Sequence, residues 1–146
     1  MVIDYTPPDI SGTPATRGFG MVASGSSYWS SGAAPTFPLD DAECYFTVTN
    51  NGSFAVDISI RATNFTGGVG WALAATPGED MVTLKAGKSG DSLESNMVTL
   101  TTSDQSFISG LGASSSKKWE LKMETPTSFT DGAEKSSTIT LTASAS

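Results

Sequence analysis

The sequence predicts an all-β protein folded as an antiparallel β-sandwich, Ig-like or jelly-roll-like, with roughly seven to eight strands. Three observations support this prediction. Short segments alternate apolar and polar side chains with the two-residue period of a strand, turn residues separate these segments, and no helical period persists beyond about two turns. A chain of 146 residues has room for one such domain.

The clearest alternation lies between residues 43 and 62. Phe46 and Val48 share one face, residues 50–53 are turn formers, and residues 54–62 alternate again. This pattern predicts a β-hairpin with one buried face.

Shorter segments of the same kind predict the remaining strands. They lie at residues 18–23, 71–75, 81–85, 97–101, 118–124 and 138–143. Residues 105–116 are expected to form a loop whose apolar side chains close the end of the core. The inward phase of the alternating segments predicts a core made of Phe46, Val56, Ile58, Trp71, Trp119, Leu121, Ile139 and Leu141.

We expect residues 1–16 to form an extended N-terminal arm and residues 17–146 to form the sandwich domain. Three prolines in the first stretch lack the N–H group that a central strand requires. Its apolar side chains could cover a neighbouring subunit, whereas a frayed terminus is the simpler alternative. The candidate contact residues of this arm are Val2, Ile3, Tyr5 and Ile10.

Tyr28 and Trp29 complete the candidate binding residues. They lie in an irregular stretch, residues 24–41, that is rich in Ser, Gly and Pro. Three roles fit this pair: packing within the domain, contact with another subunit, or stacking against a sugar.

Composition excludes several functions. The chain has 8 basic and 15 acidic residues, a net charge of −7, so it lacks the basic surface that nucleic-acid binding requires. It contains no histidine, which excludes a Ser-His-Asp triad and most zinc sites. No apolar run is long enough for a membrane helix, and the start has no secretory pattern. We therefore expect neither a nucleic-acid partner nor a membrane partner.

The carboxylates and the cysteine that could take part in catalysis are better explained as structural residues. Glu120 and Glu124 would lie about 13 Å apart along a strand, too far for a glycosidase pair. With Lys118 and Lys122 between them, they predict a solvated face of alternating charge. Cys44 falls on the apolar phase of its strand and is expected to be buried and unreactive. The sequence thus predicts no catalytic residue, metal ligand or cofactor, although loop carboxylates that converge on calcium are an alternative.

Four stretches give the chain from Glu43 onward a family resemblance: residues 45–52, 119–122, 125–132 and 137–143. Together they resemble small Ser/Thr-rich β-sandwich proteins of tailed-phage virions, particularly capsid decoration or cement proteins. The ending Ile139-Thr140-Leu141-Thr142-Ala143 is also similar to secreted bacterial fibre subunits of the camelysin and TasA type.

The virion resemblance implies a non-enzymatic protein, made in the host cytoplasm and carried on the virion surface. Its partners would be the major capsid protein or its own subunits, with a trimer as the favoured homo-oligomer. The fibre resemblance implies an extracellular subunit assembled by strand donation, and a carbohydrate-binding module is the third interpretation.

Overall fold

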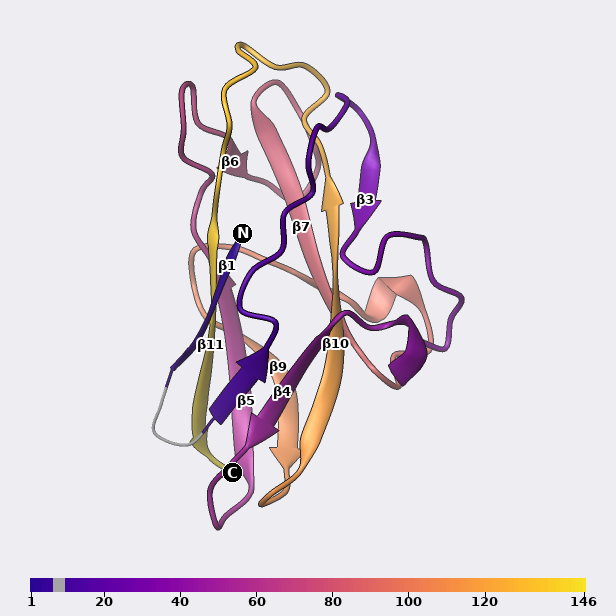
Figure 1. Ribbon diagram of the computed structural model, residues 1–146, viewed down its shortest axis with the longest axis vertical. Coiled ribbons are helices and arrows are strands. Elements are labelled where there is room, and N and C mark those ends of the chain that lie inside the picture. The colour runs from indigo at the N-terminus through magenta and orange to yellow at the C-terminus, as the bar shows by residue number, and fades with distance from the viewer. Residues whose placement is uncertain (7–9) are drawn as a thin grey trace.

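The computed structural model describes residues 1–6 and 10–146, which form two β-sheets packed face to face (Figure 1). In the described residues the regular structure consists of strands and two short 3₁₀ turns, η1 (Asp41–Glu43) and η2 (Glu94–Asn96). The strands are β1 (Val2–Thr6), β2 (Ile10–Thr13), β3 (Ser27–Trp29), β4 (Phe46–Asn50), β5 (Val56–Ala62), β6 (Ala72–Leu73), β7 (Met81–Lys88), β8 (Val98–Thr99), β9 (Gln105–Leu111), β10 (Ser116–Glu124) and β11 (Thr138–Ala145).

The predicted β-sandwich is confirmed. One sheet has four strands in the order β1-β11-β5-β9. The other has seven: the order is β2-β4-β10-β7-β6, with β3 beside β10 and β8 beside β7. Most neighbours are antiparallel, but β1 runs parallel to β11 and β6 parallel to β7. The described strands outnumber the seven or eight expected because several are too short to show an alternating pattern.

The core between the sheets contains seven of the eight residues that alternation predicts, together with further apolar residues that were not in the predicted set. Trp119 lies at its centre, stacked on Phe46 at a centroid distance of 4.4 Å and met edge-on by Phe107 at 5.8 Å. The eighth predicted core residue, Val56, is only half-buried. Phe107 belongs to β9, so the loop expected at residues 105–116 is largely a strand. Conversely, residues 18–23 form no strand.

The prediction that residues 1–16 form an extended arm outside the sandwich is wrong for the described residues. β1 pairs with β11 in the four-stranded sheet, and β2 pairs with β4 in the seven-stranded sheet. Ile3 and Ile10 are 4% and 7% exposed and belong to the core. Pairing is possible because β1 and β2 are edge strands, each needing a partner on one side only, and Pro14 follows the end of β2. Pro7 and Pro8 lie outside the described residues.

The predicted hairpin at residues 43–62 is also wrong, because β4 and β5 lie in different sheets. Their connection is an arch across the end of the sandwich, and the buried Asn50 side chain holds it in place. Its Nδ2 donates hydrogen bonds to the carbonyl oxygens of Phe54 (2.8 Å), Leu111 (3.0 Å) and Gly112 (3.1 Å). Alternation cannot separate an arch from a hairpin, since both inner faces of a sandwich face the same core.

Candidate binding surface

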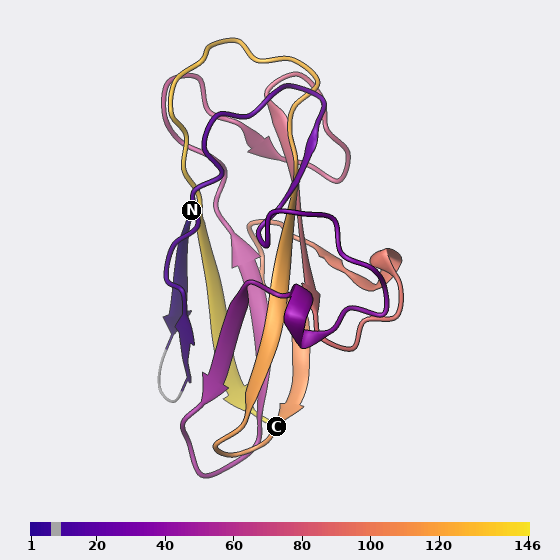
Figure 2. The same cartoon turned by 45° about the vertical axis from the view of Figure 1, so that its right-hand side comes forward.

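Residues 17–45, here called the covering segment, extend alongside β10 (Figure 2). Phe19 and Val22 pack against the core, β3 pairs with β10 within the sheet, and residues 30–45 cover the outer side of β10 at Glu120. Apart from β3 and η1 this segment has no regular structure. It is nevertheless fixed to the sheet by hydrogen bonds and by a small apolar cluster. Both attachments depend on residues that are distant in the sequence.

Glu120 is the principal attachment point and is completely buried. Its carboxylate accepts hydrogen bonds from the Ser30 hydroxyl, from the Ser31 N–H at 2.8 Å and from the Tyr45 N–H at 3.0 Å. The Ser30 hydroxyl in turn accepts the Leu121 N–H at 2.9 Å. The solvated face predicted for Glu120 is therefore wrong. Alternation places it correctly on the outer side of β10, but the covering segment excludes water there.

A second attachment is an apolar contact on the outer side of β7. Leu39 and Met97 are both buried. They pack against the backbone of Gly87, in the space that a side chain at this position would occupy. A Cβ at Gly87 would lie 2.9 Å from Met97 Cγ and 3.3 Å from Leu39 Cδ2. The Leu39 N–H donates to the Asp91 carbonyl at 2.8 Å, so this end of the covering segment is also fixed.

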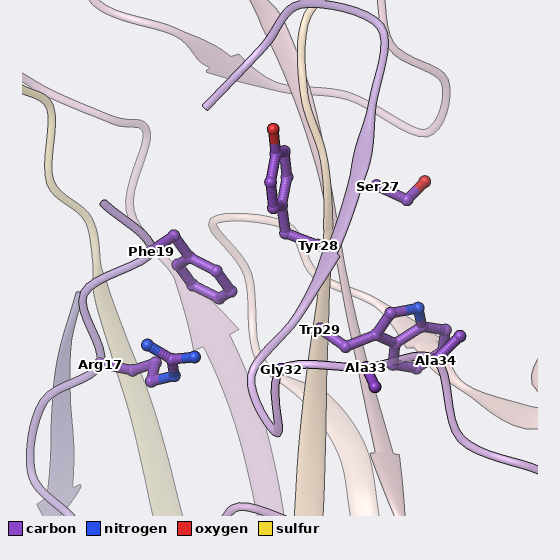
Figure 3. Close-up of a pocket in the computed structure, with 8 residues that line it drawn as sticks. All are labelled: Arg17, Phe19, Ser27, Tyr28, Trp29, Gly32, Ala33 and Ala34. Carbon is purple, nitrogen blue, oxygen red and sulfur yellow. The ribbon is translucent and has the colours of Figure 1, made fainter. Parts of the chain in front are cut away.

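Tyr28 and Trp29 line a groove of about 430 Å³ on the covering segment (Figure 3). We call it the aromatic groove; its other lining residues are Arg17, Phe19, Ser27, Gly32, Ala33 and Ala34. The Tyr28 ring points to the same side of β3 as Phe19, whereas Trp29 lies on the other side. The Tyr28 hydroxyl accepts the Ala23 N–H at 2.8 Å, and the Lys122 ammonium lies 5.3 Å from the Trp29 ring centroid. Both rings are half-buried.

Arg17 is a residue of this groove that sequence reasoning missed. Its Nε donates to the Ser30 carbonyl at 2.6 Å, and its guanidinium lies 5.2 Å from the Phe19 ring and 4.9 Å from the Tyr45 ring. The sequence signal for this residue was an arginine two positions before Phe19 in a glycine-rich stretch.

The four residues predicted for the arm lie elsewhere. Ile3 and Ile10 are in the core, Tyr5 packs against the core, and Val2 is exposed on β1. The structure therefore does not combine them with Tyr28 and Trp29 into one surface.

A second groove, of about 670 Å³, adjoins the first, because Arg17 and Phe19 line both. Besides Phe19, its aromatic lining residues are Phe65, Trp71 and Phe129, and Trp71 stacks on Phe129 at a centroid distance of 5.1 Å. Trp71 is 6% exposed, and its indole N–H has no hydrogen-bond partner within residues 1–6 and 10–146.

Lys135 and Asp131 form an ion pair in the lining of the second groove. The Lys135 ammonium lies 2.6 Å from Asp131 Oδ1 and 5.6 Å from the Trp71 ring centroid. The hydrogen bond from Lys135, followed by that from the Val69 N–H, lowers the pKa of Asp131 to about 2. Both charges are therefore compensated within the protein.

The remaining candidate groups are those for metal binding and for nucleophilic chemistry. In residues 1–6 and 10–146, no three His, Cys, Asp or Glu side chains come together to hold a metal ion. Cys44 is half-buried, not fully buried as expected, and donates its S–H to the Asp40 carbonyl at 3.3 Å. Burial, and then the charge of Glu120, raises the pKa of the thiol to about 12, which disfavours a nucleophilic thiolate.

No protein-family model matches this chain, and no curated protein or solved structure matches it either. Within the described residues, no helix has the length and apolar character needed to cross a membrane.

Proposed function

We propose that this protein is a non-enzymatic structural protein, a capsid decoration protein that binds the outer surface of a phage capsid. The observation that carries the proposal is the covering segment, an irregular surface stretch that is nevertheless fixed to the sheet. Long irregular segments in a compact domain are uncommon and usually have a function, most often in binding.

The covering segment is attached along its length. Besides Glu120, the buried Thr125 hydroxyl donates to the Ala23 carbonyl at 2.7 Å and accepts the Ser26 N–H at 2.9 Å. A surface fixed before binding loses little conformational entropy when a partner docks. This pre-organisation supports a role in attachment to a larger assembly.

The residues presented by the covering segment suit a protein partner. Met21 is fully exposed, Tyr45 is 41% exposed, and Trp29 and Arg17 lie at the aromatic groove. Aromatic residues, Met and Arg are the types enriched in protein interfaces. The net charge of −7 favours solubility and disfavours DNA contact, as expected for the outside of a particle. The proposed partners are the major capsid protein and further copies of this chain, with a trimer as the favoured oligomer.

A subunit of an extracellular fibre is the second candidate, and the position of β1 favours it. β1 is an edge strand that pairs parallel to β11 and places Ile3 in the core. The N-terminal strand of a neighbouring copy could occupy the same position, which would link subunits by strand donation.

Purified protein without any capsid separates these two functions. Light scattering after size exclusion and negative-stain electron microscopy would give the assembly state. The decoration proposal predicts small discrete oligomers, whereas long filaments would contradict it and support the fibre.

A further inference from the structure

We propose that the aromatic groove and the second groove form one continuous trough that binds a neutral oligosaccharide chain. This inference does not depend on capsid attachment. It rests on the shape of the trough, on its aromatic lining, on its unpartnered hydrogen-bonding groups and on the balance of its charges.

The shape suits an elongated ligand. The two grooves have volumes of about 430 and 670 Å³ and share Arg17 and Phe19 as lining residues. A ligand with several linked units could therefore occupy both grooves at once.

The aromatic side chains provide apolar surfaces along the trough. Phe19 and Tyr28 present their rings on one side of β3 in the first groove, Trp29 lines that groove from the other side of β3, and Phe129 lies in the second groove. All four side chains are half-buried. A partly exposed ring offers a face on which the C–H face of a sugar ring can pack. The fixed covering segment keeps the first three rings in place before a ligand arrives.

Hydrogen-bonding groups without protein partners lie beside these rings. In the first groove the Ser27 hydroxyl is exposed and has no hydrogen-bond partner among the described residues. In the second groove the buried Trp71 indole N–H has no acceptor among the described residues, as is also the case for the Trp119 indole N–H in the core. A buried donor without an acceptor is uncommon in native proteins, and a sugar hydroxyl in the second groove is one group that can accept from Trp71.

The charges favour a neutral ligand. The charged groups that line the trough are Arg17, Lys135 and the Met1 ammonium against Asp131 and Glu134, three positive and two negative. Asp131 and Lys135 compensate each other at 2.6 Å. An acidic polysaccharide or a phosphorylated ligand would meet the carboxylates of Asp131 and Glu134 beside these cations, whereas a neutral saccharide needs no matching charge.

The test begins with an array of neutral oligosaccharides of several units, including glucans, xylans and chitin fragments, with titration of each hit by calorimetry. The proposal expects at least one ligand with a Kd below about 1 mM. Phe19→Ala should weaken that binding at least tenfold. Phe54→Ala is the matched control, since Phe54 is 83% exposed in the distant arch between β4 and β5, and it should leave binding unchanged.

The three tryptophans supply a readout that needs no variant. In a ¹H–¹⁵N spectrum of the intact protein, the ligand should shift the indole signals of Trp29 and Trp71. The signal of Trp119, buried at the centre of the core, should stay in place.

Three results would overturn the proposal: no neutral oligosaccharide binds, the same ligands bind Phe19→Ala equally well, or only peptides bind the trough. The first two results would leave capsid attachment untouched, and the third would favour the protein partner proposed above, so the two proposals can fail independently.

Discussion

The ring of Tyr5 lies directly over Gly12, so that a Cβ built on Gly12 would stand 2.1 Å from Tyr5 Cζ. Tyr5 belongs to β1 in the four-stranded sheet, and Gly12 belongs to β2 in the seven-stranded sheet. This contact joins the two N-terminal strands across the edge of the sandwich, and it requires that residue 12 lack a side chain.

Gly12→Ala should destabilise the protein by about 1–3 kcal/mol, because the new methyl group forces the Tyr5 ring out of its place. Chemical denaturation followed by circular dichroism measures the change. Gly132→Ala is the control, since a Cβ there meets no atom within 4 Å. Equal stability of the two variants would show that the Tyr5 ring does not pack on Gly12.

Stability should fall at high pH, in part through Tyr5. Burial raises the pKa of the Tyr5 hydroxyl above its usual value of 10, and the neighbouring Trp119 lowers it by a smaller amount. A pKa raised on folding stabilises the protein below the unfolded value, and this contribution is lost as the pH rises above about 10. Urea unfolding at pH 8 and pH 11 should show a larger loss in the wild type than in Tyr5→Phe. Identical losses would mean that Tyr5 ionises as freely in the folded protein as in the unfolded chain.

Glu120→Gln should cost about 1–3 kcal/mol, because an amide NH₂ then replaces one of the two oxygens that accept buried donors. Amide hydrogen exchange at Ser31 and Tyr45 should accelerate, since both N–H groups bond to this carboxylate. Glu124→Gln is the matched control on the same strand. Glu124 contacts Lys85 at 3.5 Å and Lys122 at 3.9 Å in a partly exposed position, so its loss should cost less than about 1 kcal/mol. Unchanged exchange in Glu120→Gln would show that the covering segment is held by other contacts.

Cys44 should react slowly with thiol reagents in the folded protein. With a pKa of about 12, the thiol has little thiolate at pH 8. We expect alkylation about a hundredfold slower than in urea-unfolded protein, with a rate that rises as the pH approaches 12. A folded-state rate equal to the unfolded rate would contradict the environment described for this thiol.

Alternation predicted what each strand contributes to the core but not which sheet it joins. Phe46, Ile58, Trp119 and Leu141 were correctly placed inside because each follows the inward phase of its segment. The arch at Asn50 was not foreseen, since its hydrogen bonds join residues separated by up to 62 positions. Such contacts leave no local pattern in the sequence.

The N-terminal strands and the covering segment escaped prediction for related reasons. The prolines in residues 1–16 argued against strands, yet an edge strand tolerates a proline beside it because one of its sides needs no partner. The contact between Tyr5 and Gly12 forms only when the two sheets pack, so the sequence pattern does not reveal it. Glu120 alternates with the inward-facing Trp119 and Leu121, so the pattern predicts that it is exposed. It is buried because the covering segment, whose Ser30 is 90 positions away in the sequence, lies over it. Tyr28 and Trp29 were chosen as candidate binding residues because two adjacent aromatic residues stand out in a polar loop. Arg17 was not chosen because its place in the groove depends on the Phe19 and Tyr45 rings, which folding brings to it.

Immunogold electron microscopy of native material, with an antibody raised against the purified chain, tests the central claim most directly. If the protein decorates capsids, gold particles should lie on the outer shell of phage particles, at many positions on each capsid. Label confined to extracellular filaments, or its absence from every particle in material that contains the protein, would contradict the account.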